Sequence, residues 1–449
     1  MPVNGLPTVL ELAAALNRGE STSRALVAAA LARIQDPDGE GARAFRRVQP
    51  EEALADAEQS DALRRRGHVP SPLAGLPVSV KDLFDIAGQV TAAGSRVLAE
   101  APPAAADAAV VARLRAAGAV LIGRTNMTEF AFSGVGLNPH YGTPGNPADR
   151  ARIPGGSSSG AAVSVADRMA VVGLGTDTGG SVRIPAAYCG IAGFKPTAAR
   201  VPQAGCLPLS STLDSIGPLA PSVACCAIVD AILAGEPVRL PAPPPLQGLR
   251  LAVVGSYFMA DLDDAVAAAF AGALSVLSGT GAVVTEMAAP EMAEIVEANA
   301  AGGFAAAEAF AWHRELLAEK GDGYDPRIAV RIKRGAAMSA ADYIRLSRLR
   351  KDINARFWAR VAGFDAVAVP TVAQVPPEIA AFAADEDYAR LNLMSLRNTM
   401  AGNFLDCCAA TVPCQAPGQF PVGFMLMGPP GADRRILDLA QAVETALGR

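Results

Sequence analysis

Ile153-Pro154-Gly155-Gly156-Ser157-Ser158-Ser159-Gly160 is a glycine-rich stretch with serine at its centre, and a second stretch of the same kind follows it. The second reads Gly175-Thr176-Asp177-Thr178-Gly179-Gly180-Ser181-Val182-Arg183, so that Ser181 lies 24 residues beyond Ser157. A single Gly/Ser stretch is usually a flexible linker. Two of them within one short segment, each carrying serine, predict a pair of hydroxyl groups held together by the backbone.

A lysine upstream of the two stretches adds a candidate base. The run Gly75-Leu76-Pro77-Val78-Ser79-Val80-Lys81-Asp82 is mostly apolar as far as Lys81. We expect residues 76–80 to form a short buried strand with Lys81 at its C-terminal end. Lysine can act as a base only when it is neutral, and burial favours the neutral amine. Serine, serine and lysine together therefore indicate acyl transfer without histidine.

The glycines before Ser181 predict an oxyanion hole. An amide carbonyl is a poor electrophile and an amine is a poor leaving group, so amide hydrolysis needs an activated nucleophile and stabilisation of the oxyanion. Gly179 and Gly180 can adopt positive φ and present successive N–H groups to one point. That arrangement would place the donors directly before the nucleophile.

The glycines before Ser157 predict an unusual backbone at that serine. Gly155 and Gly156 tolerate conformations that other residues avoid, and we predict a cis peptide bond between Gly156 and Ser157. A serine hydroxyl both donates and accepts hydrogen bonds. We therefore expect Ser157 to lie within hydrogen-bond reach of both Lys81 and Ser181, where it could relay a proton between them.

At this point the residues resemble the amidase signature family. The resemblance covers at least residues 75–197 and, more weakly, the whole chain. Its specific part is formed by the two serine stretches, continued by Ile184-Pro185, Cys189-Gly190 and Gly193-Phe194-Lys195-Pro196-Thr197. Ser159 stands where many members of that family have glycine, which we interpret as a tolerated variant.

The resemblance implies a role for each candidate residue. It identifies Ser181 as the nucleophile, Ser157 as the serine in cis conformation and Lys81 as the base. The backbone N–H groups of Thr178, Gly179 and Gly180, together with that of Ser181, would form the oxyanion hole. Two further residues are expected at the substrate, namely Ala131, which looks like a position that lines the acyl site in relatives, and Ser158, which could equally cap the helix that follows it.

Residues that flank these candidates have simpler interpretations. Asp177 and Arg183 are expected to form a buried structural pair, and Lys195 to support loop geometry. Cys189 is expected to be a small buried hydrophobic residue. The specificity of the acyl site is expected to come from outside the signature, including residues 304–344 and 394–414.

Two motif-based alternatives are weaker. Gly156-Ser157-Ser158-Ser159-Gly160 fits the G-x-S-x-G nucleophile elbow of α/β-hydrolases, with Ser158 as nucleophile. That elbow must follow a buried strand, whereas residues 148–154 are polar and broken by proline. The elbow also needs a histidine later in the chain, and only His313 follows it. His313 lies in a stretch with a helical pattern. No G-x-x-x-x-G-K-[ST] phosphate-binding loop is present in the sequence.

The composition limits the classes of partner. The net charge is −5, with no block of basic residues, which argues against a direct nucleic-acid partner. No apolar run is long enough to span a membrane, and residues 1–20 do not have the pattern of a secretory signal. The seven cysteines are scattered and suggest reduced, mostly buried thiols. We therefore expect a cytoplasmic protein that does not act on a membrane.

The three histidines also bear on the chemistry. His68, His140 and His313 lack a metal-binding spacing. We expect no metal and no organic cofactor. The expected partner is a small-molecule amide substrate. The oligomeric state is not fixed by the sequence, and a homodimer is one possibility.

The periodicity predicts a layered α/β fold with a largely buried central sheet, mixed in strand direction and covered by helices on both faces. Strands are expected at residues 76–80, 119–122, 169–174, 249–254, 282–284 and 365–369. Helical periodicity is expected over residues 10–34, interrupted by a turn at 17–20, with Ser21 or Thr22 capping the helix that follows the turn. Thr125 is expected to cap another helix. Further helices are expected at residues 51–66, 107–117, 160–166, 263–277, 304–320, 340–361 and 433–447.

The chain is expected to form one domain over residues 1–449, with the signature core at about 75–200. The proline-rich segment at 241–245 is expected to be a surface seam between two halves of one fold. The function expected from these features is hydrolysis of a carboxylic amide to an acid and ammonia or an amine, through an acyl-enzyme on Ser181. The alternatives are the A subunit of a glutamine-dependent tRNA amidotransferase, which shares the same three residues, and an inactive scaffold of this fold, against which those three residues argue.

Overall fold

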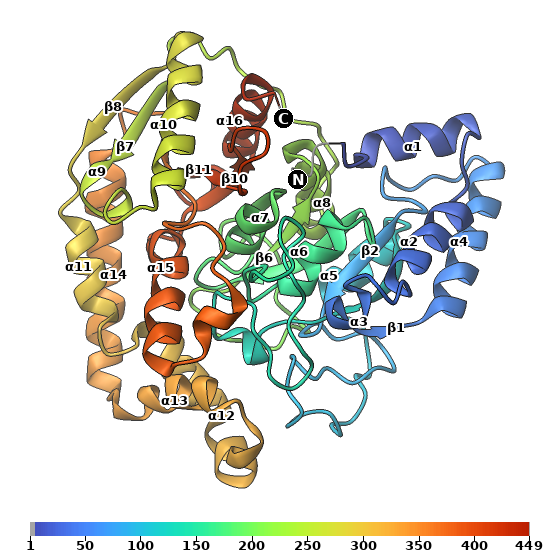
Figure 1. The fold of residues 1–449 in the computed structure, drawn as a ribbon, viewed down its shortest axis with the longest axis horizontal. Coiled ribbons are helices and arrows are strands. Elements are labelled where there is room, and N and C mark those ends of the chain that lie inside the picture. Colours follow the sequence, from blue (N-terminus) through green and yellow to red (C-terminus); the bar gives the residue numbers. More distant parts are fainter. Residues whose placement is uncertain (1–4, 449) are drawn as a thin grey trace.

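The computed structural model describes residues 5–448 and is built around one mixed β-sheet of eleven strands with helices on both faces (Figure 1). The strands are β1 (Phe45–Val48), β2 (Pro77–Lys81), β3 (Val120–Thr125), β4 (Val172–Asp177), β5 (Ala192–Lys195), β6 (Ser215–Ala220), β7 (Arg250–Val254), β8 (Val283–Met287), β9 (Ala366–Pro370), β10 (Cys408–Pro413) and β11 (Gly423–Gly428). They lie in the order β1-β3-β2-β4-β6-β5-β10-β11-β9-β7-β8. The α/β fold predicted from the sequence is confirmed.

The helices follow the strands along the chain. They are α1 (Val9–Arg18), α2 (Ser23–Ile34), α3 (Gly41–Ala44), α4 (Pro50–Arg65), α5 (Ala109–Ala116), α6 (Ser159–Ala166), α7 (Arg183–Cys189), α8 (Val223–Ala234), α9 (Gly255–Phe258), α10 (Asp264–Gly279), α11 (Glu291–Asn299), α12 (Gly303–Lys320), α13 (Pro326–Lys333), α14 (Ala340–Arg360), α15 (Asp385–Phe404) and α16 (Asp433–Ala446). Single 3₁₀ turns occur at η1 (Glu129–Ala131), η2 (Gly321–Gly323), η3 (Arg334–Ala337) and η4 (Ile379–Phe382).

The sheet is assembled from two consecutive parts of the chain. The strands β1 to β6 precede the proline-rich segment 241–245 and fill one side of the sheet, and β7 to β11 follow that segment and fill the other side. The two sides join where β5 pairs antiparallel with β10. The segment itself lies in the coil between α8 and β7.

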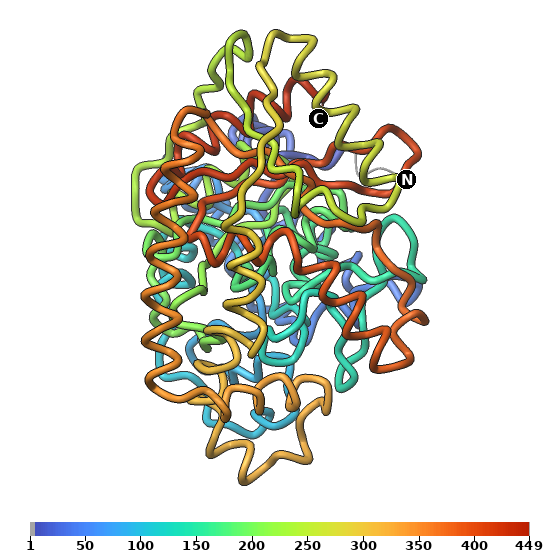
Figure 2. Tube along the Cα trace, turned by 90° about the vertical axis from the view of Figure 1, so that its left-hand side faces the viewer, coloured from blue at the N-terminus to red at the C-terminus, as the bar shows by residue number. Residues whose placement is uncertain are grey.

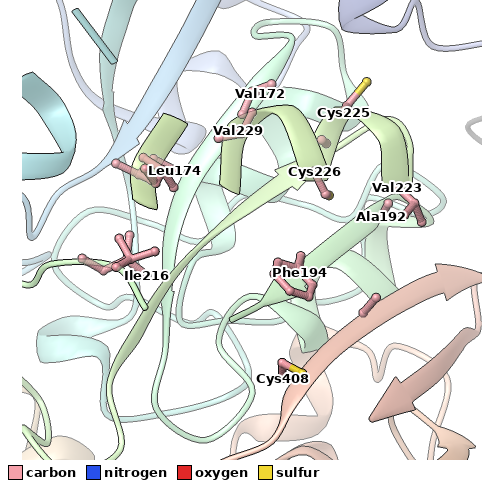
Figure 3. Packing of buried hydrophobic residues seen from close by; sticks show 14 of the residues in the cluster. Val172, Leu174, Ala192, Phe194, Ile216, Val223, Cys225, Cys226, Val229 and Cys408 are labelled. Carbon is pink, nitrogen blue, oxygen red and sulfur yellow. The ribbon is translucent and has the colours of Figure 1, made fainter. Parts of the chain in front are cut away.

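Helices cover both faces of this sheet. Apolar side chains of α5, α8, α10 and α16 pack against one face. Two further clusters lie away from that face and also include strand residues. One contains apolar side chains of α2, α4, α6 and α7, and the other contains those of α11, α14 and α15. Seven strands are consequently buried at every position, namely β2, β4, β5, β6, β9, β10 and β11. Figure 3 shows part of this core, where apolar residues of α8 and of β4, β5 and β6 gather.

The connection between α12 and α13 touches the N-terminal half of the chain. Arg96 donates to the carbonyl oxygen of Gly323 (3.1 Å), and the backbone N–H of Asp325 donates to Glu129 (2.7 Å). Figure 2 shows this connection at the lower end of the molecule, beside the loops that follow β2. No helix within residues 5–448 is long and apolar enough to cross a membrane.

The structure corrects one expected element. The sequence predicts that Thr125 caps a helix, but Thr125 is the last residue of β3, where it pairs with Lys81 of β2 and with Phe45 of β1. The next helical residues are those of η1, preceded by Thr128. Backbone pairing on both sides extends the strand beyond its apolar run, and the sequence of that strand alone does not reveal this pairing.

Candidate active site

Lys81 is the last residue of β2, an interior strand of the sheet. The strands β2 and β4 are parallel neighbours, so their C-terminal ends meet at the same edge of the sheet. Lys81 Nζ lies 2.8 Å from the Oγ of Ser157 and 2.8 Å from the Oγ1 of Thr176, which is the penultimate residue of β4. The lysine side chain is fully buried. Two hydroxyl groups therefore hold the amine in one position.

Burial changes the acid–base chemistry of this lysine. The loss of solvent lowers the pKa of Lys81 to about 7, although the nearby Cys206, Asp177 and Asp214 oppose the shift. No carboxylate forms an ion pair with Lys81 among the described residues. A substantial fraction of the amine is therefore neutral near pH 7 and able to accept a proton.

The Ser157 loop is fixed by backbone hydrogen bonds to a preceding segment. The peptide bond between Gly156 and Ser157 is cis, as predicted from the sequence. The N–H of Gly156 donates to the carbonyl oxygen of Gly134 (2.8 Å), and the N–H of Thr128 donates to the carbonyl oxygen of Ser157 (3.1 Å). The segment 128–134 is thus anchored to the Ser157 loop at both of its ends.

Of the two contacts predicted for the Ser157 hydroxyl, the one with Lys81 is observed. Ser157 contacts Lys81, whereas no hydrogen bond joins its Oγ to the Oγ of Ser181 within residues 5–448. The two serine loops nevertheless touch, because the N–H of Ser158 donates to the carbonyl oxygen of Ser181 (3.3 Å). Ser181 is 3% exposed, and it stands two residues before α7.

A buried carboxylate shapes the turn that carries Ser181. Asp177 accepts hydrogen bonds from the N–H groups of Gly180 (2.9 Å), Val182 (3.2 Å) and Arg183 (3.3 Å). The Arg183 guanidinium pairs with the same carboxylate (2.9 Å), and both side chains are completely buried, as expected from the sequence. Asn403 of α15 also donates to it (2.9 Å). These contacts fix the turn between β4 and α7.

The charge of Asp177 is stabilised inside the protein. Burial alone would raise the pKa of this carboxyl, but the attraction and hydrogen bonds of Arg183, with help from Lys195 and Asn403, hold the pKa of Asp177 well below its usual range. The carboxylate therefore stays ionised, and it keeps accepting hydrogen bonds from the turn over the whole range in which the protein would be assayed.

The backbone N–H groups of the 178–181 turn differ in whether they have an acceptor. Gly180 has a φ of 131°, and its N–H is occupied by Asp177. The N–H groups of Thr178, Gly179 and Ser181 donate to no group of the described chain. On the opposite side of the turn, the Oγ1 of Thr399 donates to the carbonyl oxygen of Gly179 (2.7 Å). Three N–H donors of the turn that carries Ser181 therefore have no acceptor within the described chain.

A second polar group supports the same turn from outside. Asp214 accepts hydrogen bonds from the Oγ1 of Thr178 (2.5 Å) and from the N–H groups of Leu209 (3.0 Å) and Ser210 (3.1 Å). Burial raises the pKa of Asp214 to about 6. The Oγ of Ser210 in turn donates to Glu308 of α12 (2.6 Å). The turn is therefore linked by polar contacts to a helix of the C-terminal half.

Ala131 lies in the segment anchored to Ser157. Phe130 and Ala131 have φ values of 49° and 60°, so the chain bends sharply in the middle of segment 128–134. Glu129 holds this bend through Ser95 (2.7 Å) and His140 (2.8 Å). Ala131 is 5% exposed. It therefore belongs to a loop that is hydrogen bonded to the Ser157 loop at both ends.

Several sequence-based interpretations can be compared directly with these contacts. Lys195 donates to the carbonyl oxygens of Pro196 and Cys407, which agrees with a structural role. Ser158 precedes α6, but its side chain makes no capping bond, and its Oγ lies 3.4 Å from the carbonyl oxygen of Thr176. The nucleophile elbow lacks its strand, since residues 153–158 are not part of the sheet. His313 lies on α12 and contacts Tyr324 instead.

The sequence motifs do not reveal the residues that position the site from a distance. Thr176 is inside the second serine stretch, and its spacing from Ser181 is the only available signal. Asp214, Thr399 and Asn403 come from segments without a glycine-rich pattern. Their contribution depends on the sheet, which brings α15 and the loop before β6 to the turn.

Comparisons with known proteins show what this chain is similar to. The family model described as Amidase matches residues 25–437. A 2-amino-5-chloromuconic acid deaminase of Comamonas testosteroni is 39% identical over 88% of this chain and 87% of its own. The A subunit of the glutamyl-tRNA(Gln) amidotransferase of Chloroflexus aggregans is 36% identical over 97% of this chain and 96% of its own. A crystal structure of an amidase superposes with a TM-score of 0.88 and 32% identity, covering 98% of this chain and 99% of that chain.

Proposed function

The chain belongs to the amidase family and is a hydrolase of carbon–nitrogen bonds other than peptide bonds, and on that premise we propose that it cleaves a small carboxylic amide through an acyl-enzyme on Ser181. The contact that carries the proposal is the one between the buried amine of Lys81 and the hydroxyl of Ser157 at 2.8 Å. An amine whose pKa is about 7 thereby contacts a hydroxyl group that can relay a proton.

In the first half of the reaction, the Ser181 hydroxyl attacks the amide carbon. Its proton passes to Ser157, whose own proton passes to the neutral amine of Lys81. The carbon–oxygen bond to Ser181 forms as the carbonyl π electrons move to oxygen. When the tetrahedral intermediate collapses, the proton returns through Ser157 to the departing nitrogen, and ammonia or an amine leaves.

The oxyanion is proposed to bind the N–H groups of the 178–181 turn. The sequence pattern assigns this role to Thr178, Gly179 and Gly180, with Ser181 beside them. The N–H of Gly180 already donates to Asp177. The donors that remain free for a ligand are therefore the N–H groups of Thr178, Gly179 and Ser181. Water then attacks the acyl-enzyme by the same proton path, releasing the carboxylic acid and restoring the Ser181 hydroxyl.

The acyl group is proposed to lie between the Ser181 turn and the segment 128–134. Ala131 and Ser158 are the two residues that we assign to it. Ala131 stands in the bend of that segment, and the N–H of Ser158 donates to the carbonyl oxygen of Ser181.

We also propose that the protein acts in the cytoplasm, as the composition of the chain suggests.

The proposal is tested by measuring ammonia release from a panel of aliphatic, aromatic and ureido amides. We expect turnover by the isolated chain and none by the Ser181→Ala variant, with circular dichroism showing that the variant is folded. Turnover by Ser181→Ala at the wild-type rate would exclude the acyl-enzyme on this residue.

A second candidate function is that of the A subunit of an amidotransferase. The observation that favours it is the 36% identity to such a protein over 97% of this chain. It would hydrolyse glutamine and pass the ammonia to a partner. Co-expression with candidate B and C subunits distinguishes the two functions, because glutamine hydrolysis that depends on the partners favours the amidotransferase, and amide hydrolysis by the chain alone favours the first proposal.

A further inference from the structure

Glu129 is a completely buried carboxylate in the segment 128–134. It accepts hydrogen bonds from the Oγ of Ser95 (2.7 Å), the Nε2 of His140 (2.8 Å) and the backbone N–H of Asp325 (2.7 Å). It forms no ion pair with any lysine or arginine in residues 5–448. Burial raises the pKa of this carboxyl, and the three hydrogen bonds oppose the shift. The buried charge therefore depends on these donors.

The three donors come from separate parts of the chain. Ser95 lies in the loop after β2 and His140 in the loop after η1, so both belong to the first part of the chain. Asp325 directly precedes α13 and belongs to the second part. Glu129 thus joins the segment 128–134 to the connection between α12 and α13.

The next residue, Phe130, packs on the same connection. The centre of its ring lies 4.4 Å from that of His313 and 5.2 Å from that of Tyr324, and the two partners are themselves joined by a hydrogen bond of 2.9 Å. The sharp bend at Phe130 and Ala131, with φ values of 49° and 60°, follows directly on the Glu129 contact. The bend is therefore held from the second part of the chain.

The far end of the segment is held by other contacts. The N–H of Gly134 donates to the Oδ1 of Asn392 in α15 (2.9 Å), and its carbonyl oxygen accepts from the N–H of Gly156 (2.8 Å). Neither contact involves Glu129. Loss of the bond between Glu129 and Asp325 should consequently release the bend without releasing Gly134 from the Ser157 loop.

We propose that Glu129 is a positioning residue that sets the length of acyl group that the site accepts, because it ties the bend at Phe130 and Ala131 to the backbone of Asp325. This inference rests on the proposed function, in which the acyl group lies against segment 128–134, and it adds a determinant of specificity. Short acyl groups end before the bend and do not sense the tie, whereas longer ones pack on it.

The backbone at Asp325 allows the tie to be cut selectively. Asp325 has a φ of −59°, and Tyr324 has a φ of −75° and a ψ of 154°, which are conformations that proline and the residue before proline adopt. Asp325→Pro therefore removes the N–H donor while the backbone keeps its path. Asp325→Ala is the matched control, because it keeps the N–H and loses the same side chain, which accepts from the N–H of Arg327.

The first experiment measures kcat and KM on straight-chain amides from acetamide to hexanamide. We expect kcat/KM of Asp325→Pro for hexanamide to fall about 10-fold below that of Asp325→Ala, through a higher KM, and that for acetamide to differ less than about twofold. A residue that only maintained the structure would change all chain lengths alike. Equal losses at every length, or no loss, would overturn the proposal.

A double-mutant cycle tests whether Glu129 is the partner in this effect. Glu129→Ala removes the acceptor and leaves room for the proline ring. In the Glu129→Ala background, the difference between proline and alanine at position 325 should disappear, because there is no hydrogen bond left to cut. A difference of the same size in both backgrounds would show that Asp325 acts without Glu129.

The second experiment does not depend on amide turnover. Mass spectrometry follows the rate at which Ser181 is labelled by alkyl fluorophosphonates with a methyl or a hexyl chain. The preference of Asp325→Ala for the hexyl reagent should be lost in Asp325→Pro, with the methyl reagent labelling both variants at similar rates. An unchanged preference would overturn the role of Glu129 and leave amide hydrolysis intact. If no amide is hydrolysed but the preference is lost, the positioning role stands and the proposed reaction is wrong.

Discussion

At the scale of single residues, Lys81 combines two properties that rarely coexist in one lysine. It is fully buried, and its amine contacts two hydroxyl groups but no carboxylate within the described chain. Because burial lowers its pKa to about 7, its neutral fraction increases as the pH rises through that value. The base role that we propose for Lys81 depends on this titration.

We therefore predict a pH profile with one inflection. The kcat/KM of wild type should rise with pH, with an apparent pKa near 7, and reach a plateau above it. Lys81→Ala should lose the inflection, and its loss of rate should be far larger at neutral pH than at high pH, where hydroxide partly replaces the base. Losses that are equal at every pH would indicate that Lys81 only maintains the structure.

We assign Asp214 a positioning role, because it contacts the turn that carries Ser181. Its carboxylate accepts three hydrogen bonds, one of them from Thr178 in the turn proposed to bind the oxyanion. In Asp214→Asn, the amide nitrogen would face one of these donors. We predict that kcat falls about 10- to 100-fold while KM changes little, since the displaced donors stabilise the transition state more than the bound substrate.

Steady-state kinetics on an amide substrate checks this prediction. Thr178→Val is the companion variant, because it removes the same hydrogen bond from the other side. If both variants raise KM and leave kcat unaltered, Asp214 acts on substrate binding and not on the turn.

At the scale of secondary-structure elements, the candidate site is built by two strands, β2 and β4, and one helix, α15. The strands β2 and β4 bring Lys81 and Thr176 to one edge, and α15 closes over the turn through Thr399 and Asn403. A β-carbon on Gly180 would collide with the Thr399 side chain, and the φ of 131° at this position also favours glycine.

This contact predicts the effect of Gly180→Ala. The turn must move away from α15, so we expect kcat to fall by about 100-fold or more, with a thermal midpoint only a few degrees lower. Differential scanning fluorimetry and ammonia release measure the two effects. Gly179→Ala is the control, since its added carbon would meet only Leu396, at 3.3 Å. A larger loss of activity in the control than in Gly180→Ala would contradict the packing argument.

The elements also show what the sequence can and cannot predict. Periodicity and capping patterns reveal the strand ending at Lys81, the helix that starts after Thr22, the helix near Glu51, and the long helices α14 and α16. The local motif likewise predicts Lys81, Ser157 and Ser181 as a group, and the contact between Lys81 and Ser157 is observed.

Other elements are invisible to local patterns for physical reasons. The strand β5 contains no β-branched residue and β10 contains two, Thr411 and Val412, and both strands are held in the sheet by pairing with distant strands. The helix α15 begins with acidic residues and has a weak apolar pattern, because it buries polar residues such as Asn403 that serve the Ser181 turn. Long-range contacts, not local propensity, define these elements.

At the scale of the whole molecule, the two parts of the chain share one sheet. The pairing of β5 with β10 crosses the boundary marked by segment 241–245, and α15 from the second part completes the turn of the first. We propose that residues 1–449 form one domain and predict a single cooperative unfolding transition by calorimetry, with calorimetric and van't Hoff enthalpies equal. Two resolved transitions would indicate that the halves are separate folding units.

The central claim is that Ser181 is the nucleophile, activated through Ser157 by Lys81. Mass spectrometry of the protein after treatment with a fluorophosphonate tests it most directly, because this reagent bonds covalently to an activated serine. We predict one label, located on the tryptic peptide that contains Ser181, with labelling much slower in Lys81→Ala at neutral pH. A label on Ser158, or labelling of Ser181 at an unchanged rate in Lys81→Ala, would contradict the account.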